Sequence, residues 1–257
     1  MNDSSLHLNI CHLYAQQLNL YGDRGNIISL VRRCGYRGIK TEVVSCGIGE
    51  DFDALGYDIV FLGGGQDFEQ ALIRNDLIGN KGPSIIKAVN EGVVFLCICG
   101  GYQMMGEYYI DQGGNRLECL KAIPVRTETG VARLIGNVIC SSAELGNDPE
   151  ENILIGFENH SGRTYLGEGA TALGSVILGA GNNGEDGTEG ARYNNVFCTY
   201  LHGSFLPKNP AMADRIIATA LKRKYPDFTA LSPLDDVFEK AARDDMKARY
   251  KLNDRIS

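Results

Sequence analysis

Residues 93–103 read Val93-Val94-Phe95-Leu96-Cys97-Ile98-Cys99-Gly100-Gly101-Tyr102-Gln103. The run from Val93 to Cys99 is wholly apolar, and such a strand belongs in the centre of a parallel sheet, buried on both faces. Two glycines follow Cys99, and a helix is predicted to begin near Tyr102. A strand, a sharp turn and a helix in this order present the residue at the turn above the sheet. The stretch therefore predicts an α/β fold with chemistry at Cys99.

Strands and helices alternate upstream of this stretch. Strands are expected at 6–13, 41–45 and 57–62, and helical patterns at 25–33, 67–78 and 85–90. This alternation is typical of an open doubly wound sheet, mostly parallel, with helices on both faces. Downstream, shorter strands are expected at 131–140, 153–158, 175–178 and 195–201. We interpret these as antiparallel additions at one edge of the sheet.

The C-terminal part of the chain returns to a helical pattern. An amphipathic helix is expected over 211–225, and a charged helix over 234–251 follows two prolines. We therefore divide the chain into a main domain, 1–225, and a C-terminal helical extension, 226–257. A solvated face is the commoner role of such a charged helix, although it can also contact a partner.

Composition excludes several classes of protein. With 257 residues, 44% hydrophobic and 22% charged, the chain is an ordinary globular protein of enzyme size. A net charge of −7 disfavours nucleic acid as a partner, and no apolar run approaches the roughly 20 residues of a membrane span. Met1 to Ser5 lacks Lys and Arg, so no secretory signal is expected. We expect a cytoplasmic protein whose eight cysteines are reduced.

Cys99 is the candidate nucleophile. The N-terminal amides of the following helix are expected to stabilise a thiolate and so lower the pKa of Cys99. The N–H of Gly100 would face the oxyanion formed when that thiolate attacks a carbonyl. Cys97 lies inside the strand, where a packing role is expected.

A thiol nucleophile needs a base, and the chain has four histidines. His202 follows a strand and precedes a glycine, which places it at the same edge of the sheet as Cys99. His160 is the rival, but its neighbours indicate a loop and a polar surface role. His7 and His12 lie in the first strand and are expected to be structural.

Two glycine-rich segments invite a functional interpretation. Gly63-Gly64-Gly65 closes an apolar strand; it is either a plain turn or a source of amides for an oxyanion hole. The segment 179–184 matches a dinucleotide fingerprint, but acidic residues and no helix follow it, so a mobile hairpin is expected instead. No ATP-binding loop is present, and Cys97-x-Cys99 lacks the paired spacing of a zinc site.

The motifs around Cys99, Gly63–Gly65 and Tyr200-Leu201-His202-Gly203 resemble the class I glutamine amidotransferases, in the branch of the cobyric acid synthase glutaminase domains. The resemblance spans about residues 6 to 225. Further segments resemble the glutaminase subunits that act with a Mur-ligase-like synthase, MurT, on lipid II: 19–26, 133–137, 156–160 and 206–210.

The resemblance implies a role for particular residues. It makes Cys99 the nucleophile and His202 the base. It further implies an oxyanion hole from Gly64, Gly65 and Gly100, and substrate binding by Gln103 and Arg133. A guanidinium can hold an α-carboxylate by two hydrogen bonds, although an ordinary surface arginine is the alternative for Arg133.

One position departs from the family pattern. Most class I amidotransferases carry Glu two residues after the histidine, to orient the imidazole, and here that residue is Ser204. The cobyric acid branch often lacks this Glu. Our hypothesis is that a partner's carboxylate supplies the orienting charge.

The implied function is the glutaminase half of an ATP-dependent amidotransferase. The chain would hydrolyse L-glutamine and pass ammonia to MurT in a heterodimer, which would amidate D-glutamate of the lipid II stem peptide to D-isoglutamine in peptidoglycan synthesis. No cofactor is expected in this chain, with ATP and Mg on the partner. The alternatives are a non-catalytic scaffold on a degenerate amidotransferase fold and a stand-alone γ-glutamyl hydrolase.

Overall fold

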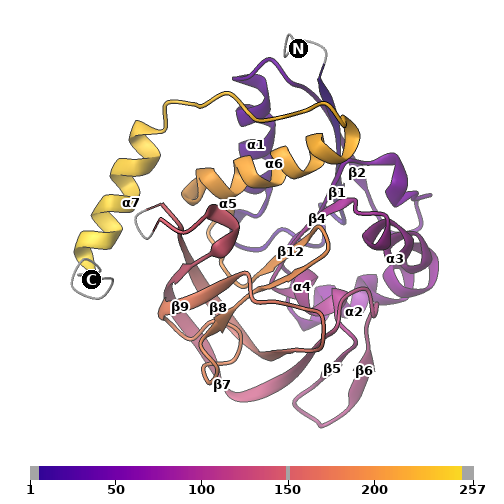
Figure 1. The fold of residues 1–257 in the computed structure, drawn as a ribbon. Coiled ribbons are helices and arrows are strands. Elements are labelled where there is room, and N and C mark those ends of the chain that lie inside the picture. The colour runs from indigo at the N-terminus through magenta and orange to yellow at the C-terminus, as the bar shows by residue number, and fades with distance from the viewer. Residues whose placement is uncertain (1–5, 149–150, 251–257) are drawn as a thin grey trace.

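The computed structural model describes residues 6–148 and 151–250, which form two β-sheets with flanking helices (Figure 1). The first sheet has the strand order β11-β12-β4-β3-β1-β2. All its neighbouring pairs are parallel except β11–β12, so the sheet is mostly parallel with an antiparallel edge strand, as expected. Its strands are β1 (His7–Leu13), β2 (Lys40–Cys46), β3 (Ile59–Leu62), β4 (Val94–Ile98), β11 (Ala191–Tyr193) and β12 (Val196–Thr199).

Helices cover both faces of this sheet. From β1 the chain crosses to β2 on one side, and from β3 it crosses to β4 on the other, so right-handed crossovers place the two sets of helices on opposite faces. Every residue of β3 and β4 is buried between them. The helices are α1 (Arg24–Gly35), α2 (Asp67–Asn75), η4 (Asp76–Lys81), α3 (Gly82–Asn90), α4 (Gly100–Met105), α5 (Phe205–Lys208) and α6 (Pro210–Lys224), and short 3-10 turns lie at η2 (Leu20–Gly22), η3 (Ala54–Gly56) and η5 (Ala143–Leu145).

Three of the four downstream strand regions, 131–140, 153–158 and 175–178, lie in a second sheet, with the order β10-β9-β7-β5-β6 and β8 paired to β7. The fourth, 195–201, contains β12, which joins the parallel sheet and pairs parallel with β4. The expectation that the first three extend one edge of the parallel sheet is wrong. The reason is that β7 and β8 are long, 17 and 14 residues, and pair with each other antiparallel, so their backbone groups are satisfied within their own hairpin. The strands are β5 (Tyr108–Ile110), β6 (Arg116–Glu118), β7 (Val125–Ser141), β8 (Ile153–Leu166), β9 (Gly174–Leu178) and β10 (Thr188–Glu189).

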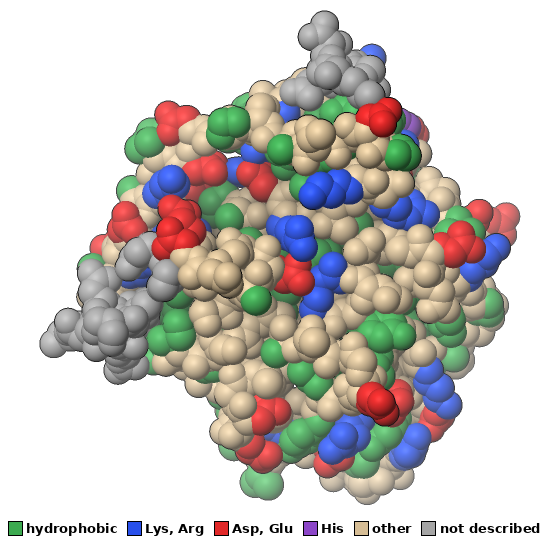
Figure 2. Space-filling model, in the orientation of Figure 1, with side chains coloured by type: hydrophobic (Ala, Val, Ile, Leu, Met, Phe, Trp, Pro, Cys, Tyr) green, Lys and Arg blue, Asp and Glu red, His purple; other side chains and the backbone are tan. Residues whose placement is uncertain are grey.

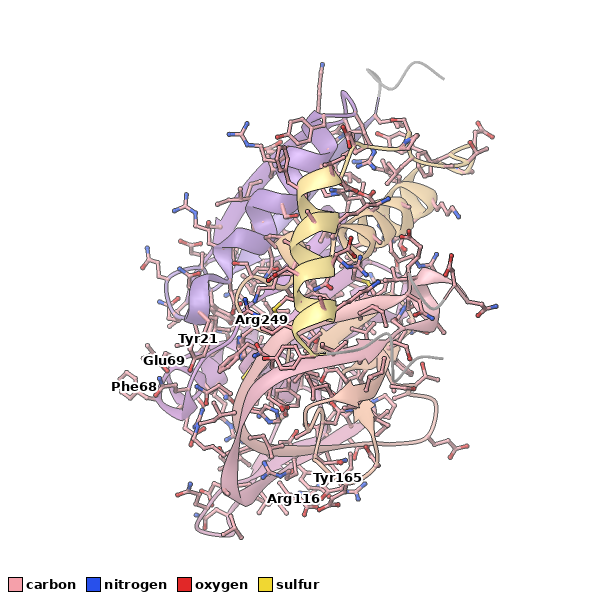
Figure 3. All side chains as sticks on the ribbon, turned by 90° about the vertical axis from the view of Figure 1, so that its left-hand side faces the viewer. Tyr21, Phe68, Glu69, Arg116, Tyr165 and Arg249 are labelled. Atoms are coloured by element: carbon pink, nitrogen blue, oxygen red, sulfur yellow. The ribbon has the colours of Figure 1, made fainter. Side chains whose placement is uncertain are left out.

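The last helix, α7 (Val237–Arg249), lies apart from the parallel sheet, beside the long hairpin (Figures 1 and 3). Its Met246, with Tyr250 just beyond the helix, packs against a small apolar cluster on the hairpin. Just before the helix, Arg33 Nη1 donates to Asp236 Oδ1 at 2.7 Å. The C-terminal helix therefore contacts the body of the protein on one side, and Phe238 on it is 87% exposed.

Surface charge is mixed. Acidic and basic side chains are interspersed over the face shown in Figure 2. Among the described residues, no helix is both long enough and apolar enough to cross a membrane.

Candidate active site

Cys99 occupies a sharp turn between β4 and α4. Its φ of 49° and ψ of −104° are strained for a residue with a Cβ, as at a nucleophile elbow. The two glycines after it are required by packing, because a Cβ on Gly100 would lie 2.6 Å from the Gly65 carbonyl oxygen and one on Gly101 2.6 Å from that of Leu62. The predicted elbow is confirmed. Cys97, inside β4, is fully buried, as expected.

His202 lies beside Cys99. It follows β12, and its N–H donates to the Phe157 carbonyl at 2.8 Å. A Cβ placed on Gly64 would lie 3.0 Å from His202 Cε1 and 3.6 Å from Cys99 Cβ, so both side chains flank the same glycine. Neither ring nitrogen of His202 has a partner among the described residues. The imidazole is therefore available to accept a proton.

A cavity of about 170 Å³ opens beside the elbow. Cys99, Gln103 and Arg133 line it, together with Tyr21 and Phe68, which lie on the same side of the molecule in Figure 3. The volume is below the several hundred Å³ typical of sites for drug-sized ligands, so it suits a small substrate.

Arg133 is exposed at the mouth of this cavity and is held in place there. Its Nε donates to Asn159 Oδ1 at 3.0 Å and its Nη2 to the Asn159 carbonyl at 2.9 Å. Asn159 in turn donates to the Tyr21 hydroxyl at 2.5 Å, and the Tyr21 ring packs edge-on against His202 at 4.9 Å between centroids. The arginine is thus oriented toward the site, and its contact with a substrate carboxylate stays a prediction.

Gln103 is buried in the wall of the cavity. Its Nε2 donates to the Tyr200 hydroxyl at 3.1 Å, and its Oε1 accepts from Gln70 Nε2 at 3.0 Å. The side-chain amide is therefore engaged with its neighbours, and any direct contact with substrate remains a prediction.

The N–H of Gly64 does not face the cavity in this structure, because it donates to Asp23 Oδ2 at 2.6 Å. The predicted oxyanion role then falls on the N–H groups of Gly65 and Gly100. Asp23 is fully buried, and no motif in the sequence predicts a role for it. A signal was present: the turn Tyr21-Gly22-Asp23 follows the carboxyl end of the first strand, the edge of a sheet where ligands bind.

The electrostatics of the site differ from expectation. Burial, and then the nearby Asp23 carboxylate, raise the pKa of Cys99 to about 12, while the Gly100 N–H and Arg133 oppose this. The expected lowering of the Cys99 pKa is wrong, since desolvation of the sulfur outweighs the amides of a helix of only six residues. Burial, and then His160, lower the pKa of His202 to about 4. At neutral pH a neutral thiol faces a neutral imidazole.

His160 lies on β8 and not in a loop, and the residue is 2% exposed. The expectation of a surface role is wrong, because β8 continues past the residues that resemble a turn. The ring stacks on Tyr200 at 3.7 Å between centroids, and Nδ1 is 2.8 Å from the Gly162 carbonyl oxygen. His160 also lines the cavity.

Ser204 does not replace the missing carboxylate. Its hydroxyl donates to the Gly22 carbonyl at 2.6 Å, which ties the segment after His202 to the loop before α1. Among residues 6–148 and 151–250, no group donates to or accepts from the His202 ring.

No helix follows the segment 179–184, as expected. The N–H groups of Ala180 and Gly181 donate to the two carboxylate oxygens of Glu158 at 2.8 and 2.9 Å, so a side chain of this protein occupies the place of a phosphate. The segment connects the antiparallel strands β9 and β10, so the expected hairpin is confirmed. Its Asn182 and Asn183 are buried, which packs this part of the hairpin against the protein. Among the described residues no cluster of three or more His, Cys, Asp or Glu is arranged to hold a metal ion.

Residues 9–210 match the family described as the CobB/CobQ-like glutamine amidotransferase domain, and the chain belongs to this family. Two relatives are similar over most of the chain, and both are described as the "Lipid II isoglutaminyl synthase (glutamine-hydrolyzing) subunit GatD". That of Streptococcus pneumoniae is 41% identical over 90% of this chain and 86% of its own length. That of Staphylococcus aureus is 43% identical over 84% of this chain and 86% of its own length.

More distant proteins share the family or the fold. A probable cobyric acid synthase of Methanosphaerula palustris is 30% identical over 71% of this chain and 36% of its own length. Two solved structures have a TM-score of 0.54. PurLQS from Thermotoga maritima is 14% identical, and the match covers 84% of this chain and 98% of that chain. The Trypanosoma brucei CTPS glutaminase domain with bound acivicin is 13% identical, and the match covers 88% of this chain and 98% of that chain. At such identities these two structures support the α/β fold alone.

Proposed function

We propose that this chain is the glutamine-hydrolysing subunit of a lipid II isoglutaminyl synthase. Membership of the glutamine amidotransferase family and relatives at 41 and 43% identity support this proposal. The observation that carries the proposal is the position of Cys99. It has a positive φ, lies beside His202, and lines a small cavity that Arg133 also lines.

In the proposed reaction, the Arg133 guanidinium binds the α-carboxylate of glutamine and places the side-chain amide against Cys99. Sγ attacks the carboxamide carbon while His202 accepts the thiol proton, so the thiolate forms only during attack. This order follows from the neutral resting pair, since no thiolate is present beforehand. The N–H groups of Gly65 and Gly100 donate to the oxyanion.

Collapse of the tetrahedral intermediate breaks the carbon–nitrogen bond. His202 returns its proton to the nitrogen, ammonia leaves, and a γ-glutamyl thioester remains on Cys99. Water then attacks the thioester with His202 as the base, and the products are glutamate and the free thiol. Cys99 must stay reduced between turnovers, so we expect the reaction to occur in the cytoplasm.

The partner in this proposal is a Mur-ligase-like subunit, MurT. It would bind ATP and Mg²⁺, activate D-glutamate of the lipid II stem peptide, and receive the ammonia to form D-isoglutamine. Because no carboxylate occupies position 204, we also propose that the partner supplies the group that orients His202. If so, the isolated chain hydrolyses glutamine more slowly than the complex, and equal rates would contradict this part of the proposal.

A glutamine-like diazoketone tests the central assignment, with the labelled peptide identified by mass spectrometry. We expect covalent mass at Cys99 in the complex, none in Cys99→Ser, and labelling and ammonia release largely intact in Cys97→Ser, the matched control two residues away. Equal losses in both variants would refute the choice of nucleophile. If the chain stays unlabelled in the complex, the scaffold alternative is favoured. If the chain hydrolyses γ-glutamyl peptides without a partner, the hydrolase alternative is favoured.

A further inference from the structure

Asp23 is a fully buried carboxyl group at the N-terminus of α1. Its Oδ2 accepts the Gly64 N–H at 2.6 Å, and its Oδ1 is buried and has no hydrogen-bond partner among the described residues. The Leu20 N–H donates to the Gly64 carbonyl at 3.3 Å. The loop before α1 thus binds both backbone groups of the glycine that separates Cys99 from His202.

The carboxyl lies close to both candidate catalytic side chains. The same Cβ position on Gly64 that is 3.0 Å from His202 Cε1 and 3.6 Å from Cys99 Cβ is 3.1 Å from Asp23 Oδ2. The three side chains therefore surround one glycine, and a negative charge buried beside a thiol is weakly screened, so it opposes ionisation of the thiol.

We propose that Asp23 is a positioning residue for Cys99: it fixes the Gly63–Gly65 turn through the Gly64 N–H, and its negative charge adds to burial in disfavouring the thiolate of Cys99. The identification of Cys99 as the nucleophile rests on the proposed function, whereas the effect of Asp23 on the thiol does not. A movement that transfers the carboxylate to another donor would free the Gly64 N–H for the oxyanion and remove the charge that disfavours the thiolate.

The charge on Asp23 changes near neutral pH. Burial raises the pKa of Asp23 to about 7, and the hydrogen bond from Gly64 lowers it only in part. After burial, Asp23 is the next cause of the raised pKa of Cys99. The Gly100 N–H and the charge of Arg133 favour the Cys99 thiolate, and the charge of Glu189 disfavours it. His202, whose pKa is also influenced by His160, titrates well below this range.

The test is the rate at which iodoacetamide alkylates Cys99 in the full chain between pH 5.5 and 9, read from the mass of the peptide that contains it. Below pH 6, Asp23 is largely protonated, so Asp23→Asn and the natural protein should react at similar rates. Above pH 8 the variant should react about tenfold faster, since one pKa unit of the thiol is a tenfold change in thiolate. Asn keeps an acceptor for the Gly64 N–H, so the turn is retained.

Glu189→Gln is the matched control, because the pKa of Glu189 is also raised to about 7, mainly by burial, and its influence on Cys99 is smaller. We expect it to change the alkylation rate less than Asp23→Asn. A ratio of variant to natural rates that is independent of pH would overturn the proposal and indicate loosening of the turn alone.

The natural protein supplies a second measurement should Asp23→Asn fold poorly. Its logarithmic alkylation rate should rise with a slope below one between pH 6.5 and 8, as Asp23 ionises, and the same flattening should persist in Glu189→Gln. A slope of one throughout would overturn the proposal. Neither measurement uses glutamine or a partner, so a failure of the proposed function leaves this result interpretable.

Discussion

Replacing Gly64 with alanine would place a methyl group between the two candidate catalytic side chains. The new Cβ would lie 3.0 Å from His202 Cε1, 3.1 Å from Asp23 Oδ2 and 3.6 Å from Cys99 Cβ. The first two distances are shorter than ordinary van der Waals contact, so His202 or Asp23 must move by a few tenths of an ångström. The backbone itself is not strained, because Gly64 is not among the glycines with positive φ.

The expected result is a large loss of activity with a modest loss of stability. Misplacement of a reacting group by about 1 Å can cost roughly a hundredfold in rate, which sets the upper limit of the effect. Overpacking by one methyl group costs about 1–3 kcal/mol in the free energy of unfolding. We therefore expect the rate of glutamine hydrolysis by the complex to fall tenfold to a hundredfold in Gly64→Ala. Urea denaturation should show that the variant is still folded.

Gly79→Ala is the matched control. Gly79 is exposed on η4, and a Cβ there would meet nothing within 4 Å. The same chemical change should therefore leave hydrolysis unaltered and stability equal or slightly higher, since alanine lowers the entropy of the unfolded chain. Full activity in Gly64→Ala would refute the reasoning, because it would mean that Cys99 and His202 do not act across this glycine.

Two further predictions concern substrate binding and pH. Arg133→Ala should raise the KM for glutamine about tenfold to a hundredfold in steady-state assays, because charge-assisted hydrogen bonds to a carboxylate contribute about 1.5–3 kcal/mol; an unchanged KM would assign the α-carboxylate to another group. The folded-state pKa of His202 lies below its ordinary 6.5, so the stability it contributes is present above pH 6.5 and is lost as pH falls toward 4. Between pH 7 and pH 4, the free energy of unfolding from urea denaturation should fall by about 3 kcal/mol more in the natural protein than in His202→Gln. If the free energies of unfolding of the two proteins changed in parallel with pH, a buried neutral imidazole would be contradicted.

The parts of the fold that depend on local pattern could be predicted from the sequence. The apolar run before Cys99 and the two glycines after it are neighbours in the chain, so the strand, the elbow and the packing role of Cys97 follow from local rules. The long hairpin of β7 and β8 could not be predicted in this way. Its extent depends on pairing between residues such as Val125 and Leu166, far apart in sequence, and Gly130 interrupts the local strand pattern.

The residues that carry the chemistry can be found in the sequence alone: a cysteine at a strand-to-helix turn, a histidine after a parallel strand, and the motifs of a glutamine amidotransferase. The protonation states of this cysteine and histidine depend on the fold. The pKa values of Cys99 and His202 depend on burial and on Asp23 and His160, which come from other elements of the fold. Desolvation and Coulomb interactions act through space, and the folded chain alone determines which groups lie within their range.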